Sequence, residues 1–570
     1  MTVQTIRATG KKVFLLSICL FGFTVVQING EPSGRTTYNL DFDIEFEHSS
    51  LTGREVLSYV NQTKKPVDSL FFHLYPNYQA NKKDQSESPI RISAVSSNGR
   101  ALKYDVDQEQ LKVYLSSSVA PDEGVQITIE FTGQVPLVTD SMTNTLAHLM
   151  RELSSAAVRK SIERRGNETF LRSDDVMLLG FAYPILAVQN GQKWQTGVPD
   201  TMGDMEFSES ADYRVKVTTE RGLVIAMSGL EHRLQSELES KQIVESSGEQ
   251  IREFGIIIGR NLAVSETSVG ATKVRSIFRE RDASVGKNLL TKAADAVSVY
   301  ASLFGQFPYP KLDVVEAPLL PGHSEYEFSG LVLLAGAYYI DFKGPSAKSL
   351  PGFIREQAST FEEGFEFTAV HGIAHQWWGE VVECNPYRHS FLDEALAGIS
   401  SVLYLQHTYN KGFANQQVDA QVKAAYRVYR AFGGNDLPAD SPLSDFNNEF
   451  QFSAIVQTKG TLFLYQVLNL VGEKEFGQAL SRYFQKYQFR IANPDDLLTE
   501  ISADLEPKDR DAVHKLYHRW LHEKHGDQDI GTPPIQISID LGSDPKQSQR
   551  RLRRFGRFFL TIGKTAVRPF

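Results

Sequence analysis

Cysteine is almost absent from this chain of 570 residues, which contains only Cys19 and Cys384. Cys19 lies in an apolar stretch near the N-terminus, so removal of that stretch would leave one thiol without an intramolecular partner. A fold held together by disulfides is therefore excluded. The length exceeds what a single core usually organises, so we expect several domains stabilised by burial of apolar side chains.

An excess of positive charge is also missing. The chain has 60 lysines and arginines against 69 aspartates and glutamates, a formal net charge of -9. This balance gives no general attraction to nucleic acid or to anionic lipid, so neither is an expected partner. No low-complexity tract and no repeat of fixed period occurs, which excludes a repeat architecture.

One long apolar run is present, at residues 13–26 (VFLLSICLFGFTVV), and it follows Lys11 and Lys12. Basic residues before a short apolar run are typical of a secretory signal. The run is too short to span a bilayer comfortably, so we expect residues 1–30 to be a cleaved signal peptide that leaves no stable membrane span. The chain is then exported, to an extracellular or periplasmic location, with an uncleaved N-terminal anchor as the alternative.

The region from 35 to 262 has the pattern of a β-sheet domain. Residues 38–47 (YNLDFDIEFE) alternate strictly between apolar and polar side chains, which predicts a half-buried strand. Similar short segments recur between turn residues up to position 262. Residues 144–165 break the pattern with apolar side chains at near-helical spacing, and we interpret them as a helical insertion.

Beyond residue 263 the apolar period becomes helical, in segments such as FTAVHGIAHQWWGEVV and KGTLFLYQVLNLVG. Residues 263–528 therefore form a mostly helical domain, in which residues 447–452 are predicted to be a loop. Residues 529–570 are expected to be a short β fragment with strands at 535–541 and 557–562. The basic run between these strands (QRRLRRFGR) is interpreted as a solvated face.

A metal site is indicated in the helical domain. His371 and His375 are four residues apart, which places both imidazoles on one helix face and allows them to bind one metal ion. Glu394 follows after 18 residues, at the start of another helical pattern. Two histidines and a carboxylate leave a fourth position of a tetrahedral zinc ion open for water. An unoccupied structural remnant is the alternative.

The segment HGIAHQWWGEVV, followed by FLDEALAG, resembles the metal-binding stretch of the alanyl aminopeptidase (aminopeptidase N-like) family of gluzincins. Further motifs match in the family's order over residues 37–530, among them LTGREVLSYVNQT, FGQFPYPKLDVVEAP and EYEFSGLVLL. The resemblance implies a multidomain α+β fold, with an N-terminal antiparallel β-sheet domain followed by a thermolysin-like zinc-metallopeptidase domain. It also implies one zinc ion (Zn2+), with peptides or protein N-termini as partners. Glu327 corresponds to the family's glutamate that binds the free amino group of the substrate.

Two departures from the family concern catalysis. The family has H-E-x-x-H, where the glutamate takes a proton from the attacking water and later passes it to the leaving amine; this chain has Gly372 there. The family's oxyanion-stabilising tyrosine is replaced by Gln457. Loss of a general base reduces the rate by roughly 10²–10⁴, and loss of one oxyanion donor by roughly 10²–10³. No catalytic group of the family is then intact, and we expect a zinc-binding protein whose hydrolysis of N-terminal residues is impaired.

Three residues are alternatives for the missing base: His323, Glu325 and Glu380. We expect Glu380 to point away from the metal-binding face and Glu325 to point elsewhere than its neighbour Glu327. Two other functions therefore stay open. One is an active zinc aminopeptidase that uses a substitute base, and the other is a non-catalytic structural or interaction protein that keeps only the fold.

Overall fold

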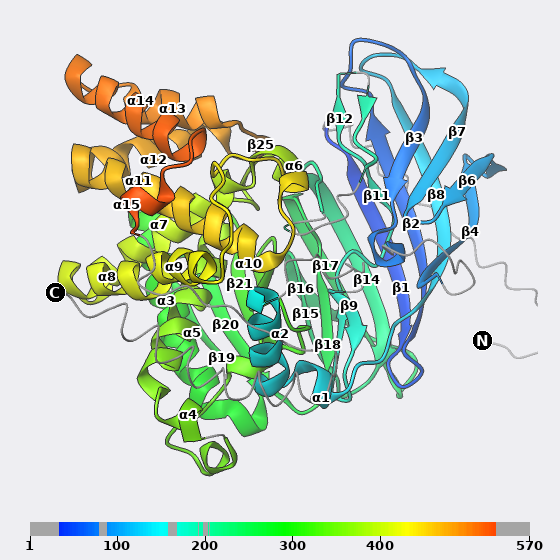
Figure 1. Cartoon of the computed structure of the whole chain (residues 1–570). Coiled ribbons are helices and arrows are strands. Elements are labelled where there is room, and N and C mark those ends of the chain that lie inside the picture. Colours follow the sequence, from blue (N-terminus) through cyan, green and yellow to red (C-terminus); the bar gives the residue numbers. More distant parts are fainter. Residues whose placement is uncertain are drawn as a thin grey trace, which may run out of the picture.

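A computed structural model describes residues 34–78, 88–157, 168–191, 193–197, 203, 206–350 and 352–531. The predicted signal peptide at 1–30 and the predicted C-terminal strands at 535–541 and 557–562 lie outside these residues. Within the described ranges no helix is long and apolar enough to cross a membrane. The N-terminal β domain and the helical domain lie side by side (Figure 1), which is the fold class that the sequence predicts.

Alternation builds the central strand of the β domain. In β1 (Thr37–Glu45) Tyr38, Leu40, Phe42 and Ile44 are all buried, whereas the residues between them face outward. Parallel to β1 runs β14 (Ala211–Glu220), and antiparallel to it runs β2 (Ser50–Val60). Each inward side chain therefore meets an inward side chain of the neighbouring strand, as the stacked rings of Tyr38 and Tyr213 show.

The β domain contains three larger sheets within the described residues. The largest has the order β16 (Leu230–Leu234), β17 (Lys241–Ile251), β14, β1, β2, β8 (Gly124–Gln134), β4 (Ile90–Ser97) and β5 (Arg100–Ala101). The second has the order β15 (Val224–Met227), β18 (Ile256–Gly259), β10 (Val176–Leu179) and β9 (Phe170–Arg172), and the third β11 (Ile185–Leu186), β3 (Val67–His73), β7 (Gln110–Val119) and β6 (Tyr104–Asp107).

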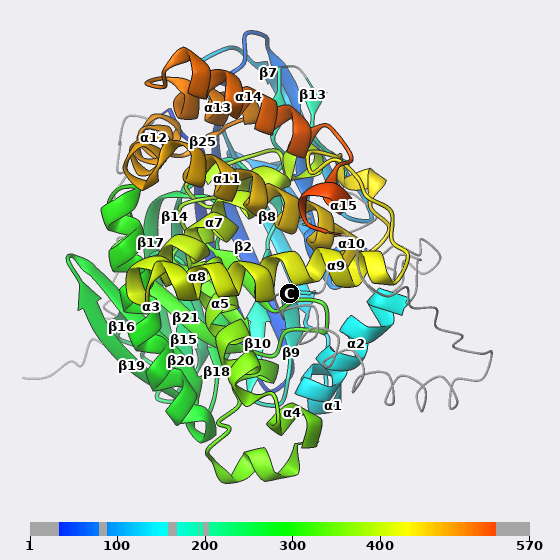
Figure 2. The same cartoon turned by 60° about the vertical axis from the view of Figure 1, so that its left-hand side comes forward.

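The helical domain starts with a five-stranded sheet, which the helical pattern of the sequence did not indicate. Its order is β19 (Leu262–Val269), β20 (Thr272–Arg279), β21 (Lys311–Ala317), β23 (Leu331–Ala335) and β22 (Glu325–Phe328). β22 is the edge strand and pairs antiparallel with β23. The longer helices are α3 (Ala283–Leu303), α5 (Ala358–His375), α7 (Phe391–Thr408), α11 (Thr458–Val471), α12 (Glu473–Tyr487) and α14 (Pro507–Leu521). Figure 2 shows α5, α7 and α11 stacked behind α8 (Lys411–Gln417) and α9 (Ala424–Ala431).

Part of the predicted insertion at 144–165 is the helix α2 (Thr145–Ala157), and residues 158–167 lie outside the described ranges. This helix leaves the β domain and lies against the helical domain, beside α10 (Glu449–Phe452) in both views (Figures 1 and 2). Thr145 donates a hydrogen bond to the carbonyl of Ala337 (2.7 Å), and Arg151 pairs with Glu449 (2.6 Å). The insertion therefore connects the two domains.

The prediction of a loop at 447–452 is wrong for residues 449–452. Glu449–Phe452 is the one-turn helix α10, whose first turn is capped by Asn448 through a hydrogen bond from the backbone N–H of Gln451 (2.8 Å). The chain continues through a π-helical turn, Ser453–Gln457, into α11. A single turn contains too few residues to show a helical period in the sequence.

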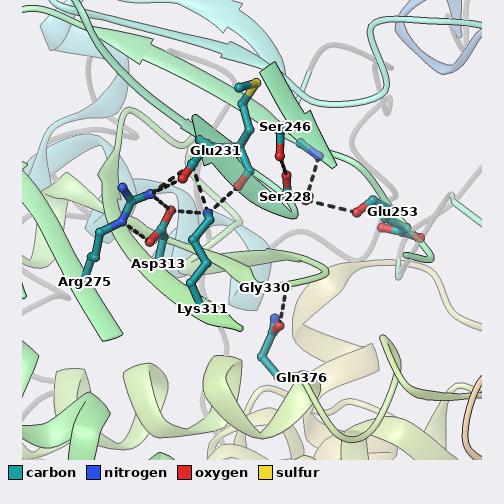
Figure 3. Close-up of polar contacts among 11 residues, drawn as sticks. Ser228, Glu231, Ser246, Glu253, Arg275, Lys311, Asp313, Gly330 and Gln376 are labelled. Carbon is teal, nitrogen blue, oxygen red and sulfur yellow. Dashed lines mark hydrogen bonds and ion pairs between the residues drawn. The ribbon is translucent and has the colours of Figure 1, made fainter. Parts of the chain in front are cut away.

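A buried ionic cluster joins the domains (Figure 3). Lys311 and Asp313 of β21 form an ion pair (2.6 Å), and Arg275 of β20 binds the same aspartate. Glu231 of β16, from the β domain, accepts from Lys311 (3.0 Å) and from Arg275 (2.9 Å). Two cations therefore balance two carboxylates, which is the condition under which buried charges are tolerated.

Candidate metal centre

Helix α5 presents the two predicted histidine ligands. His371 and His375 lie in its last turns with ring centroids 4.8 Å apart, as a spacing of four residues requires. The helix is buried on nearly all sides here, since Ala369, Val370 and Ile373 are fully buried. The histidines are thus held on a helix with little freedom to move.

Glu394 reaches the same point from the first turn of α7, which packs against α5. Its Oε2 atom lies 3.6 Å from Nε2 of His371 and 3.8 Å from Nε2 of His375. The three candidate ligand atoms all lie within 4.8 Å of one another. Ligand atoms of a tetrahedral zinc site are about 3.4 Å apart at zinc–ligand distances of about 2.0–2.2 Å, so this donor set fits a zinc ion.

Hydrogen bonds at the far side of each imidazole fix the orientation of the rings. Nδ1 of His375 donates to the carbonyl of Trp378 (3.0 Å), and Nδ1 of His371 lies 2.8 Å from Oε1 of Glu325. Both Nε2 atoms are therefore left to face Glu394. Carboxylate or carbonyl acceptors behind metal-binding histidines are a recurrent feature of zinc sites, where they set the tautomer of the ligand.

The electrostatics agree with a site for a cation. Burial on its own lowers the pKa of His375, but the carboxylates of Glu394 and Glu327 raise it, and the result lies well above the ordinary value. Burial likewise raises the pKa of Glu394, yet the adjacent imidazoles lower it below the ordinary value. The buried carboxylate is thus compensated by positive charge, which a metal ion supplies when it displaces the imidazole proton.

The three residues line a central pocket of about 420 Å³, which is large enough for a small peptide end. Glu325 and Glu327 of β22 also line it, and so do Arg151 and Glu449 at the contact between α2 and α10. Five further carboxyl groups line the pocket, against one arginine, Arg151; they belong to Glu206, Glu253, Glu380, Glu383 and Asp393. The pocket therefore offers a negative environment to a positively charged ligand group.

Gly372 lies between the two histidines and faces β22. A Cβ atom at this position would lie 2.7 Å from Oε2 of Glu325 and 2.7 Å from Oε1 of Glu327. The expectation that Glu325 points elsewhere than Glu327 is therefore wrong, because residues two apart on a strand share one face. That periodicity is the signal from which the sequence alone could have placed both carboxylates at Gly372.

The other two candidate bases have different partners. Oε2 of Glu380 accepts a hydrogen bond from Ser329 (2.6 Å), while His323 lies 3.4 Å from Glu168.

Gln457 reaches the site from the π-helical turn before α11. Its amide donates to Oε2 of Glu394 (3.0 Å), and its Oε1 accepts from Ser453 (2.6 Å). Gln457 therefore contacts a candidate ligand of the metal.

Comparison with known proteins agrees with these features. Residues 354–520, which contain all three candidate ligands, match the Peptidase family M1 domain. The chain is 21% identical to Aminopeptidase M1-A of Oryza sativa subsp. japonica over 288 residues, which is 50% of this chain and 30% of that protein. It is 27% identical to Aminopeptidase N of Lactobacillus delbrueckii subsp. lactis over 209 residues, 35% of this chain and 22% of that protein. The match thus spans less than a third of either relative.

The fold resembles a solved structure over most of its length. The M1 zinc metallopeptidase from Deinococcus radiodurans superimposes with a TM-score of 0.56 and 17% identity, covering 90% of this chain and 96% of that chain. A mutant of that protein has been solved bound to a Tyr-ser-ala substrate. The family resemblance of the sequence motifs is confirmed by these comparisons.

Proposed function

We propose that this chain is a zinc-dependent aminopeptidase, because residues 354–520 match the Peptidase family M1 domain and the fold resembles that of an M1 zinc metallopeptidase. It binds one zinc ion through His371, His375 and Glu394. The observation that carries the proposal is the convergence of these three ligand atoms within 4.8 Å in a pocket that also contains Glu327. Zinc held there would activate water and polarise the scissile carbonyl group of a peptide.

Glu327 defines which end of a peptide the pocket accepts. Its carboxylate lies beside Gly372 and contributes to the raised pKa of His375, so its negative charge faces the metal centre. A free ammonium group would form a charge-assisted hydrogen bond with it. We therefore propose peptides and protein N-termini as ligands, with an acetylated N-terminus excluded.

The sequence predicts impaired hydrolysis because Gly372 has no side chain. Gln457 is a second reason to expect slow turnover, whereas Glu325 is a reason to expect some activity. Gln457 provides no hydroxyl group for the oxyanion, which supports slow turnover. Glu325 brings a carboxylate to the space beside Gly372, which supports the alternative of a substitute base. We propose slow but zinc-dependent hydrolysis rather than binding alone.

The test uses purified protein with its zinc content measured by mass spectrometry and a panel of aminoacyl fluorogenic substrates. We expect one zinc per chain, turnover that a chelator removes and zinc restores, and no turnover of N-acetylated substrates. His375→Ala and Glu394→Ala should lose both zinc and turnover. A wild-type protein that holds no more zinc than these variants contradicts the proposal.

Export of the chain is a separate proposal, and it depends on the pattern of residues 1–30. Expression of the full chain followed by N-terminal sequencing of the released protein tests it. A mature N-terminus near residue 30 supports a cleaved signal, whereas an intact Met1 on membrane-associated protein supports the uncleaved anchor.

A further inference from the structure

The space that a side chain at position 372 would occupy is already filled. An ideal Cβ on Gly372 would lie 2.7 Å from Oε2 of Glu325, 2.7 Å from Oε1 of Glu327 and 3.1 Å from Cγ1 of Val332. Real Cβ atoms do not approach other heavy atoms to less than 3.0 Å, so either the glycine is retained or the carboxylate moves. Glycine at 372 and glutamate at 325 are thus sterically complementary. Strand β22 places a carboxylate in the space where helix α5 has no side chain.

Glu325 is held at one oxygen and open at the other. Its Oε1 contacts Nδ1 of His371 at 2.8 Å. Its Oε2 is buried and has no hydrogen-bond partner among the described residues. A buried carboxylate oxygen without a partner is costly and calls for an explanation, such as a ligand or a reacting group. The unpartnered oxygen is the one that faces the space beside Gly372.

The end of helix α5 fixes the strand that carries this glutamate. The side chain of Gln376 accepts from the backbone N–H of Gly330 (2.7 Å; Figure 3) and donates to the carbonyl of Phe328 (3.1 Å), both at the turn between β22 and β23. Ser329, in the same turn, donates to Glu380 (2.6 Å). The carboxylate of Glu325 is therefore positioned by elements that also position the histidines, as a catalytic group requires.

We propose that Glu325 replaces the absent side chain at position 372 as the proton acceptor of the hydrolytic reaction; this inference depends on the proposed aminopeptidase function. Oε2 of Glu325 takes one proton from water as the water oxygen bonds to the scissile carbonyl carbon. The same proton then passes to the peptide nitrogen as the C–N bond breaks. The second water proton stays on the new carboxyl group, which ionises, and the products are a free amino acid and a shortened peptide.

Two substitutions at this position separate proton acceptance from support of His371. Glu325→Gln keeps an oxygen that can accept from Nδ1 of His371 but cannot take a proton, so zinc affinity should stay within about threefold while kcat falls by roughly 10²–10⁴. Glu325→Ala removes both functions, and zinc affinity should also fall by roughly 10–100-fold. Glu362→Gln, the same exchange at an exposed position of α5 outside the pocket, is the matched control and should change kcat by less than about threefold.

Gly372→Glu tests whether a carboxylate supplied by helix α5 can replace that of Glu325. Gly372→Glu in wild type introduces a side chain where Glu325 already lies, and it should lower both the melting temperature and kcat. In the Glu325→Ala background the same substitution should recover at least tenfold of the lost kcat, because the carboxylate then comes from α5.

The steric relationship can also be tested on metal-free protein, without an activity assay, by measuring the melting temperatures of alanine variants in α5. A Cβ at Gly364 would meet only Gln421 at ordinary contact distances of 3.6 and 3.8 Å, so Gly364→Ala should raise the melting temperature of metal-free protein by about 1–2 °C. Gly372→Ala should give no such rise in wild type and should be better tolerated when Glu325 is alanine, because Oε1 of Glu327 is then the one atom left within 3.0 Å of the added Cβ among those described around it. Additive shifts at 325 and 372 contradict the steric pairing.

The outcomes distinguish failure of this inference from failure of the proposed function. A wild type that binds no zinc overturns the proposed function. A wild type that holds zinc and turns over substrate, with Glu325→Gln equally active, overturns the inference alone. Equal losses of zinc and of kcat in Glu325→Gln also overturn it, since Glu325 would then be only a positioning residue for His371.

Discussion

Gln457 donates its side-chain amide to Oε2 of Glu394 over 3.0 Å, so the residue that the sequence motifs align with the family's tyrosine contacts a candidate metal ligand. Gln457→Tyr should restore the missing hydroxyl group and raise kcat by up to about 10²-fold, with little effect on KM. Steady-state kinetics on aminoacyl fluorogenic substrates measures this. Gln457→Phe is the control because it adds the ring without the hydroxyl; an equal rise in both variants contradicts the oxyanion explanation.

The account of Glu327 predicts an effect on substrate binding. Glu327→Gln removes the negative charge that would face the free amino group of the peptide, and a charge-assisted hydrogen bond contributes about 1.5–3 kcal/mol. We expect KM to rise by roughly 10–100-fold and zinc content to stay at one ion per chain. Inhibition by free amino acids should weaken in parallel. If KM is unchanged, the amino group is bound elsewhere in the pocket.

The ionic cluster of Figure 3 predicts a large loss of stability from one substitution. Lys311 is almost completely buried between Asp313 and Glu231, so Lys311→Met leaves two carboxylates with Arg275 as their only cation in the cluster. Removing one partner of a buried pair costs about 3–5 kcal/mol. Lys216→Met is the control, since its pair with Asp41 is exposed and should contribute less than about 1 kcal/mol.

Chemical denaturation followed by circular dichroism measures both variants. The expected result is a clear drop in the denaturation midpoint for Lys311→Met and almost none for Lys216→Met. Similar midpoints for the two variants would show that the cluster adds nothing beyond what a surface pair adds.

A pH dependence follows from His73. Burial lowers the pKa of His73 to about 4, against the raising effect of its hydrogen bond to the carbonyl of Gln195. In the unfolded chain this imidazole titrates near pH 6.5. Above that pH both states are neutral. Between pH 6.5 and pH 4 only the unfolded chain binds the proton, so the free energy of unfolding falls with pH by up to about 1.4 kcal/mol per unit.

His73→Gln keeps a donor toward Gln195 and removes the titration. Unfolding measured at several pH values should show the variant gaining on wild type as the pH falls from 6.5 to 4, with a constant difference above pH 7. His48→Gln, at an exposed position, is the control. Parallel curves for wild type and His73→Gln would contradict the linkage.

The sequence predicts those parts of the fold and site that depend on local periodicity. The alternation of residues 38–47 predicts β1, and the spacing of His371 and His375 places them on one helix face. The apolar pattern does not predict the strands of the five-stranded sheet, because β21 and β23 are buried on both faces and show no alternation. The ionic cluster depends on β16, β20 and β21 meeting in space, and no local pattern encodes that contact.

Glu325 shows how a local rule can be overlooked. Its strand is only four residues long, Glu325–Phe328, which is too short for an alternating apolar pattern to be recognised in the sequence. Once β22 is recognised, period two places Glu325 and Glu327 on one face. Their closeness to Gly372 depends on how α5 crosses the sheet edge, which only the tertiary structure provides.

The most direct test of the account is the zinc affinity and kcat of wild type, Glu325→Gln and the double variant Glu325→Ala with Gly372→Glu, measured on the same protein samples. The account predicts one zinc per chain and activity in wild type, unchanged zinc affinity but loss of activity in Glu325→Gln, and weaker zinc binding in the double variant with activity recovered once zinc is supplied in excess. Zinc-loaded Glu325→Gln that is as active as wild type would contradict it.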